Sequence, residues 1–387
     1  MRAIALSFAL LVPAAAAAQG GNPGNPDTAI GAQKCYRSGS NTMTTCASAD
    51  LAGQDGQLGR DATAGQNGDA DGTLGFSYTK ICNSGQFANS GSCPADPPLG
   101  DSPDQWGCTY DNVSGRTWEM KTATGLRAAT ATYTNYTPQY DPKGQYRSAT
   151  DAQGYIDRLN AQGLCGATDW VVEHIAVRQA LVSYGRPADG KARVDVRWFP
   201  TLQPGRYWAT SDHAPDVVHE WTLDFGDGST TDADARDVPH FVHAVRRWVH
   251  NLPGSRWLYS GDGTEVTDVQ ANNMVWRRCV EGQVFDGTTC TGTPLHLTHE
   301  DALKYAQGQP GWRLPNIKEL TWIVEREQFA PALDRTAWPG SPSDVYWTST
   351  PEVRATKRAW ALDFFHGAGY TALRTETHVL RLVHSAP

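Results

Sequence analysis

The chain carries one sequence pattern twice, and this duplication limits the possible folds more than any other feature. The stretches "GRYWATS" and "HEWTLDFGDGS" recur further on as "DVYWTST" and "RAWALDFFHGA". Trp208 and Trp221 lie thirteen positions apart, and so do Trp347 and Trp360. A repeat of roughly 130 to 150 residues is too long for a solenoid unit and predicts two copies of one domain.

The domain boundaries follow from this repeat and from the N-terminal residues. Residues 1–18 have the order of a secretory signal peptide, since Arg2 precedes a short apolar run that ends in small alanines. Residues 19–103 form a cysteine-containing segment with a disulfide hairpin, residues 104–250 the first copy and residues 256–387 the second. We therefore expect an exported protein that is secreted or located at the cell surface, with a periplasmic location as the alternative.

Eight cysteines in an exported chain favour disulfide bonds over metal thiolates. Three pairs share a spacing of eleven positions, and two cysteines remain for each other. The predicted pairs are Cys35 with Cys46, Cys82 with Cys93, Cys279 with Cys290, and Cys108 with Cys165. Eight cysteines can pair in many other ways, so this assignment is an inference from spacing.

Two periodicities occur within each copy. From Ile317 onward apolar residues recur at helical spacing through Val324, and Asn316 followed by Glu319 has the order of a capping box. Later, apolar residues alternate with small or polar ones at 221–225 and 360–364, which is typical of strands with one buried face. Because these strands follow one another without helices between them, we expect an α+β fold.

The first copy keeps the apolar positions of the helix but has lost its start signals. His174 stands where the second copy has Asn316, and Val177 stands where it has Glu319. Ile175 retains the apolar character of its counterpart. A short helix is held mainly by its buried face, and a lost cap costs only about 1 kcal/mol, so we interpret this motif as structural.

Several of these stretches resemble a known family. "WRLPNIKEL", "YWTST", "AWALDFFHG" and "VLRLV" are similar to the C-terminal domain of the Lcl collagen-like adhesin and its bacterial relatives. The first copy is similar through "DNVSGRTWE", "LNAQGLCGATDW" and "WTLDFGDG", but lacks the Arg-Leu-Pro signature. The resemblance implies two tandem C-type-lectin-like modules, each with about two helices and a twisted antiparallel sheet that bears long loops. It also implies exported proteins that bind surfaces.

The composition and the motifs of the chain argue against several classes of function. The net charge of −8 is spread through the chain without a basic block, which argues against nucleic acid as a partner. The mature chain has no apolar run of the length that a transmembrane helix needs. A nucleophile elbow, a phosphate loop and a paired-carboxylate motif are all missing, so we expect no enzyme.

No cofactor is expected, with calcium as the one alternative. Asp224, Asp227 and Asp232 lie in the acidic stretch "DFGDGSTTDADARD", where clustered carboxylates suit a hard cation. The competing interpretation is a hairpin turn, because Asp-Gly is common in such turns.

Binding is the function that the sequence favours. Trp347 and Trp360 recur in both copies and are expected in the core, whereas aromatic and basic residues of the second copy's loops can recognise a ligand. The expected ligand-binding residues are Trp338, Arg354, Lys357, Arg358, His366, Tyr370 and Arg374. We predict an adhesin-like protein that binds extracellular glycans or another surface ligand. The alternative is a structural or tip component of an extracellular appendage that binds other proteins.

Overall fold

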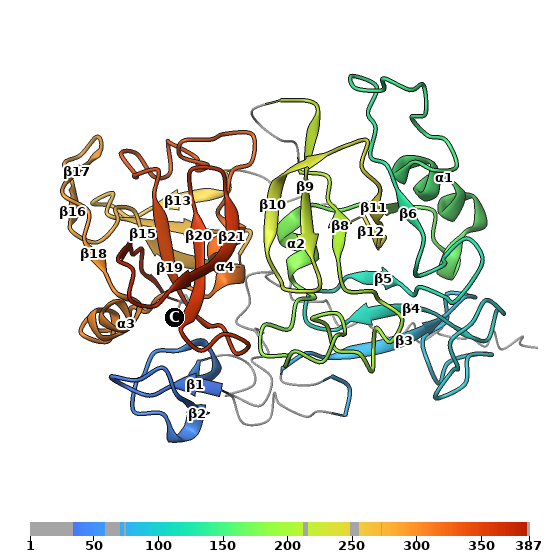
Figure 1. Ribbon diagram of the computed structural model, residues 1–387, viewed down its shortest axis with the longest axis horizontal. Coiled ribbons are helices and arrows are strands. Elements are labelled where there is room, and N and C mark those ends of the chain that lie inside the picture. The colour runs from blue at the N-terminus through green and yellow to red at the C-terminus, as the bar shows by residue number, and fades with distance from the viewer. Residues whose placement is uncertain are drawn as a thin grey trace, which may run out of the picture.

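The chain forms two copies of one β-rich scaffold that lie side by side. The computed structural model describes residues 34–58, 70–72, 75–211, 216–247, 255–271 and 273–384, so the expected signal peptide lies outside the described residues. Figure 1 shows the first copy in colours from light blue through green to yellow and the second mainly in orange and red, with the N-terminal segment that holds β1 and β2 in darker blue below the second. None of the described helices is both long and apolar enough to cross a bilayer.

The first copy contains two five-stranded sheets. In order across the first sheet lie β3 (Tyr78–Cys82), β4 (Trp106–Asp111), β5 (Thr117–Glu119), β12 (Val245–Arg246) and β7 (Trp170–Val171). In order across the second lie β10 (Thr230–Ala235), β9 (His219–Asp224), β8 (Arg206–Trp208), β11 (His240–Phe241) and β6 (Thr132–Tyr133). The helical elements of this copy are α1 (Ala152–Gln162), η5 (Leu164–Gly166) and α2 (Ile175–Gln179).

The second copy has a four-stranded sheet, a five-stranded sheet and a small hairpin. The first sheet runs through β13 (Trp257–Tyr259), β14 (Glu265–Asp268), β15 (Met274–Arg277) and β23 (Val383–His384). The second runs through β18 (His296–Leu297), β22 (His378–Val379), β19 (Val345–Pro351), β20 (Arg358–Asp363) and β21 (Ala368–Leu373). The remaining elements are the hairpin β16 (Gln283–Phe285) and β17 (Cys290–Gly292), with helices α3 (His299–Gln307) and α4 (Ile317–Trp322).

The strand pairing repeats between the copies. Strands β10-β9-β8-β11-β6 of the first copy correspond in order to β21-β20-β19-β22-β18 of the second. The parallel pair β8 and β11 matches Tyr207 with Phe241, and the parallel pair β19 and β22 matches Tyr346 with Val379. The duplication seen in the sequence is therefore present in the register of the sheets.

The predicted α+β class is wrong. About 12% of the described residues are helical, and the chain is mostly β, arranged as a four-bladed β-propeller rather than as two C-type-lectin-like α+β modules. The stretches with helical spacing form helices of only five residues in α2 and six in α4. Val324, expected in the helix, instead forms a β-bridge with Leu333. Helices this short are marginal by themselves, so paired strands supply most of the regular secondary structure.

One hydrophobic cluster extends through both copies, and two further clusters lie to either side of it, one within the first copy and one between the second copy and the N-terminal segment. Trp221 and Trp360 are each 1% exposed, as expected, and belong to one hydrophobic cluster with residues from the two halves. The Tyr184 ring of the first copy packs on Trp360 at 4.7 Å, and the Arg326 guanidinium of the second lies 5.1 Å from the Trp221 ring. At Gly228, where φ is +87°, a Cβ would come within 3.4 Å of Trp360. We call this reciprocal contact the seam.

All four disulfides have the predicted pairing. Three of them close local turns eleven positions apart. The fourth joins Cys108 of β4 to Cys165 of η5 and thereby ties a sheet to the end of a helical region. Disulfides of this kind stabilise a loop-rich chain by about 2–4 kcal/mol each.

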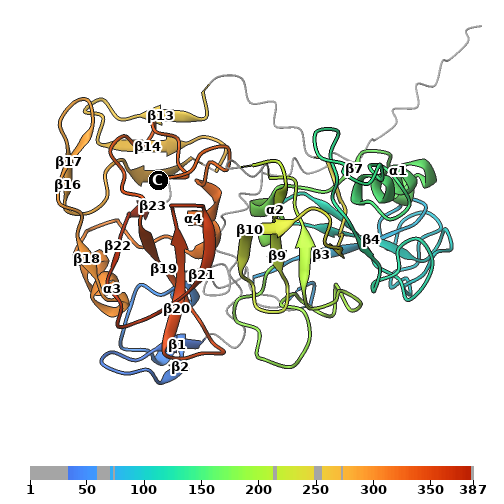
Figure 2. The same cartoon turned by 45° about the horizontal axis from the view of Figure 1, so that its top comes forward.

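The N-terminal segment, residues 34–58, packs on the second copy rather than on the first, which follows it in sequence (Figures 1 and 2). It contains β1 (Lys34–Tyr36), β2 (Met43–Thr45), η2 (Cys46–Ser48) and η3 (Asp55–Gln57). Tyr36 lies in a buried cluster with Leu303 and Trp347, and its hydroxyl donates to the Arg358 carbonyl. Thr350 Oγ1 donates to Asp55 Oδ2 at 3.0 Å.

Candidate functional site

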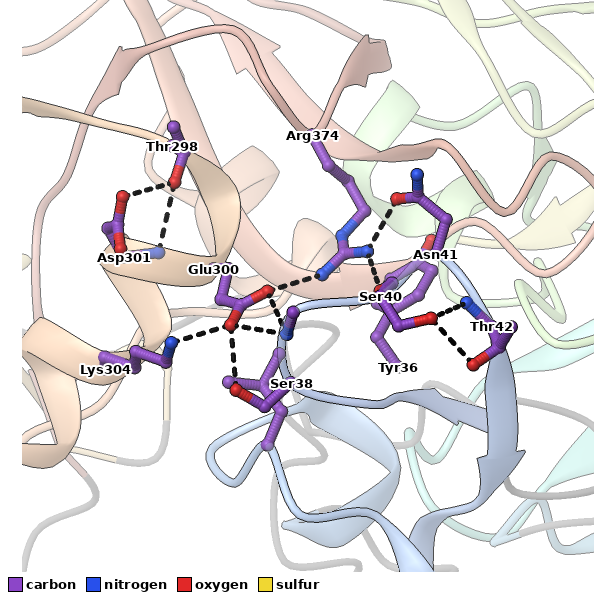
Figure 3. Close-up of polar contacts among 12 residues, drawn as sticks. Tyr36, Ser38, Ser40, Asn41, Thr42, Thr298, Glu300, Asp301, Lys304 and Arg374 are labelled. Atoms are coloured by element: carbon purple, nitrogen blue, oxygen red, sulfur yellow. Dashed lines mark hydrogen bonds and ion pairs between the residues drawn. The ribbon is translucent and has the colours of Figure 1, made fainter.

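A groove of about 340 Å³ lies where the N-terminal segment meets the second copy. Its lining residues are Gly39, Ser40, Asn41, Thr298, Glu300, Arg374 and Thr375. These residues come from the β1–β2 loop, from the start of α3 and from the chain just after β21, and Figure 3 shows Asn41, Glu300 and Arg374 of the three segments side by side. We call this feature the N-terminal groove.

Arg374 forms the floor of the N-terminal groove. It is 5% exposed, and its Nη1 donates to the Ser40 carbonyl at 2.7 Å and to Asn41 Oδ1 at 2.9 Å. The guanidinium also lies 3.8 Å from the centre of the Tyr36 ring, a favourable cation–π contact. Its Nε has no hydrogen-bond partner in the described part of the chain. Burial lowers the pKa of Arg374, although Tyr36 and Glu300 act in the opposite direction.

Glu300 supplies the negative charge. It lies in the first turn of α3, which Thr298 caps by accepting from the Asp301 N–H. The Glu300 carboxylate accepts from Gly39 N at 2.8 Å and from Lys304 Nζ at 2.6 Å. Burial alone would raise the pKa of Glu300, but these hydrogen bonds outweigh it and lower the pKa to about 2. The carboxylate is therefore ionised at neutral pH.

The N-terminal groove presents hydrogen-bond donors next to hydrogen-bond acceptors. Arg374 Nη2 lies 3.7 Å from Glu300 Oε2, so a donor and an acceptor of opposite charge are held side by side. Asn41 is exposed, and its Nδ2 makes no hydrogen bond to the described residues, while the exposed Thr375 adds a hydroxyl. Hydroxyl-rich ligands need neighbouring donors and acceptors of this kind. The Tyr36 ring is fully buried beneath Arg374 and offers no stacking face.

A family model for the Lcl C-terminal domain matches the chain twice, over residues 107–246 and 264–384, which together make more than half of its length. The chain belongs to the Lcl C-terminal domain family. The predicted tandem pair of Lcl domains is thereby confirmed. No curated protein and no solved structure matches the chain.

The two walls of the N-terminal groove differ in their relation to the family. Glu300 and Arg374 lie inside the second Lcl match, whereas residues 39–41 lie outside both matches. The groove therefore joins an Lcl domain to a segment that the family model does not include.

Three of the expected ligand-binding residues serve packing or structural hydrogen bonding. Trp338 is fully buried and packs on Trp257 at 4.6 Å, so its expected surface position is wrong. Arg354 Nε donates to the Arg186 carbonyl of the first Lcl domain at 2.9 Å and thus joins the two domains. Arg358 Nε donates within its own sheet to Thr371 Oγ1 at 3.0 Å.

Lys357 is a backbone neighbour of Arg374, whose N–H donates to the Lys357 carbonyl at 2.9 Å, but neither it nor the other remaining expected residues line the N-terminal groove. Lys357 and His366 are exposed, and Tyr370 is half-buried. Lys357 precedes the six-residue strand β20 and His366 follows it, so their backbones lie about 20 Å apart along the strand. Of the seven predicted residues, only Arg374 lines the N-terminal groove.

The acidic stretch of the first Lcl domain forms a turn. Asp224 Oδ1 accepts from Gly226 N at 2.6 Å, and Asp227 Oδ1 accepts from Ser229 N at 2.8 Å. Asp232 lies further along, on β10. Within the described ranges no three His, Cys, Asp or Glu side chains are placed to hold a metal ion together. The carboxylates of Asp224 and Asp227 thus stabilise the turn, which agrees with the hairpin interpretation.

Sequence reasoning missed most of the N-terminal groove. Thr298, followed by the acidic residues Glu300 and Asp301, predicts the start of a helix. This pattern places Glu300 near a helix N-terminus. No local pattern, however, connects Glu300 to Gly39, which is 261 positions away.

Proposed function

We propose that this Lcl-family protein is an exported, non-enzymatic binding protein that recognises an extracellular glycan through the N-terminal groove. The observation that carries the proposal is the arrangement of Arg374, Glu300 and Asn41, which offers a cation, an anion and an amide on one open surface.

The polar groups are held in place before a ligand arrives. Arg374 is fixed by Ser40 and Asn41, and Glu300 is fixed by Gly39 and Lys304. A sugar ring that adds hydrogen bonds to such groups loses little affinity to side-chain ordering. The groove is open, and none of its described lining residues is aromatic, so we expect weak binding per site and a benefit from multivalent presentation.

A glycan array probed with the full mature chain, disulfides intact, tests the proposal. Asn41→Ala and Thr375→Ala should each lower saccharide retention at least about tenfold, equivalent to about 1.4 kcal/mol. Thr377→Ala is the matched control, because Thr377 is exposed and lies outside the groove lining. Retention that is absent, or that is unchanged in both groove variants, would overturn the proposal. Co-purification of an appendage subunit in place of saccharide retention would favour the structural alternative.

A further inference from the structure

A second cavity, of about 240 Å³, lies at the seam between the two Lcl domains. The first copy contributes Arg116, Glu173, His174 and Val177, and the second copy contributes Arg256, just ahead of its Lcl match, with Gln270, Trp322, Val324 and Glu325. Both domains are needed to enclose it. We call it the seam cavity.

One part of the seam cavity is cationic. Arg256 is held by Asp268, with Nη2 at 2.7 Å from Oδ2, and by the Trp322 carbonyl at 2.9 Å. These contacts use Nε and Nη2, so Nη1 is the nitrogen without a hydrogen bond to a described residue. Arg116 adds a second guanidinium that is only 3% exposed. A ligand carboxylate can therefore meet an oriented N–H donor.

The opposite charge is present in the same cavity. Glu325 is half-buried, and although its N–H donates to the Ala332 carbonyl at 3.0 Å, its carboxylate makes no hydrogen bond or ion pair with the described residues. Glu173 uses one oxygen to accept from His174 N at 3.1 Å. Burial lowers the pKa of His174 far below its usual value, so its ring is neutral at physiological pH. A ligand ammonium group can therefore pair with Glu325.

An apolar wall completes the seam cavity. Val177, Val324 and the Trp322 side chain line it beside the charged groups. Its volume is below the roughly 300–1,000 Å³ of sites for drug-sized molecules. The occupant is therefore small, with two opposite charges and an apolar part.

We propose that the seam cavity binds a free α-amino acid with an apolar side chain. Its carboxylate faces Arg256, its ammonium group faces Glu325, and its side chain packs on Val177, Val324 and Trp322. A neutral sugar would leave the half-buried Glu325 carboxylate without an ionic partner, and a simple anion would be repelled by Glu325. This inference concerns a different site and does not depend on the N-terminal groove.

Isothermal titration of the full mature chain with L-leucine and L-phenylalanine tests this inference. N-acetyl-leucine and leucinamide are the comparison ligands, because each lacks one of the two charges. We expect both free amino acids to bind, and we expect the loss of either charge to weaken binding at least about tenfold.

Glu325→Gln should weaken leucine binding at least about tenfold and reduce the preference for leucine over N-acetyl-leucine. Glu327→Gln is the matched control, since Glu327 is exposed two positions away and does not line the cavity. Equal thermal unfolding of the two variants shows that any difference comes from the site. Absence of binding by both amino acids, or leucine affinity unchanged in Glu325→Gln, overturns the inference. Glycan retention is scored separately, so failure at one site does not count against the other.

Discussion

Arg374 shows how burial changes the role of one residue. Its position among loop residues indicated an exposed ligand contact. The N-terminal segment instead covers Arg374, and only 5% of the residue remains exposed. The guanidinium then holds the β1–β2 loop through Ser40 and Asn41 while still lining the N-terminal groove. One side chain therefore positions the segment and shapes the candidate site.

Arg374→Met should release the N-terminal segment from the second Lcl domain. The substitution removes two hydrogen bonds and one of the two cationic partners of Glu300, so we expect a loss of about 2 kcal/mol in the free energy of unfolding. Urea unfolding measures the loss, and hydrogen exchange should increase at residues 34–46. Arg246→Met is the control, because Arg246 and its partner Asp169 are 46% and 41% exposed and such pairs contribute about 1 kcal/mol at most. Equal losses in the two variants would contradict this role.

Glu300 should make the same contact sensitive to acid. Its pKa is about 2 in the folded chain and 4.5 in its ordinary state, so its contribution to stability is complete above pH 4.5 and disappears as the pH falls toward 2. Because the side chain is partly exposed, we expect that contribution to be about 1 kcal/mol. Urea unfolding of the wild type and Glu300→Gln at about pH 6 and about pH 3 measures it. The stability difference between the two proteins should shrink at the lower pH, and a constant difference would refute the assignment.

At the scale of elements, the two copies of the capped helix differ less than their sequences suggest. Asn316 and Glu319 form the predicted capping box of α4, with Glu319 N 2.8 Å from Asn316 Oδ1. The interpretation that α2 has no cap is wrong, because His174 Nδ1 accepts from Ala176 N at 3.3 Å. An imidazole with a strongly lowered pKa is neutral and can accept a hydrogen bond, so it replaces the amide oxygen.

Asn316→Ala should therefore destabilise the chain more than His174→Ala. The Asn316 cap is shorter and belongs to a reciprocal box, so we expect a loss of about 1–2 kcal/mol, against about 0.5 kcal/mol for the longer His174 contact. Chemical denaturation of the two variants measures both values. A larger effect at His174 would assign that residue a role beyond capping.

At the scale of the whole molecule, the two Lcl domains share their core. The reciprocal contacts of Trp221 and Trp360 place a large ring of each domain against the other. Arg354 adds hydrogen bonds from the second domain to carbonyl groups of the first. The seam is therefore part of the fold, and a domain taken alone would expose apolar surface.

Trp360→Ala should be among the costliest single changes. The ring is 1% exposed and contacts Tyr184 across the seam, so its loss should reduce the free energy of unfolding by about 3–5 kcal/mol. Trp312→Ala is the control, because Trp312 is only partly buried in the same domain. Calorimetry should show the larger loss for Trp360. Two separate unfolding transitions in the wild type would contradict a shared core.

The sequence by itself determined the features that rest on local or periodic patterns. The duplication, the four disulfides and the burial of Trp221 and Trp360 could be predicted, because each leaves a repeated spacing along the chain. The capping box at Asn316 was likewise readable within four residues. The fold class could not be predicted in this way. Helical spacing over two turns does not decide between a longer helix and a short one that leads into a strand.

Only the tertiary structure decided where the candidate sites lie. The hydrogen bond from Arg374 to Ser40 joins positions 334 apart, and the seam cavity combines residues from both domains. Such contacts follow from the packing of whole surfaces, in this case the N-terminal segment on the second Lcl domain and one domain on the other. Packing of this kind produces no repeated spacing in the sequence. Several tertiary arrangements can bury the same apolar faces, and all of them are compatible with the same local sequence patterns.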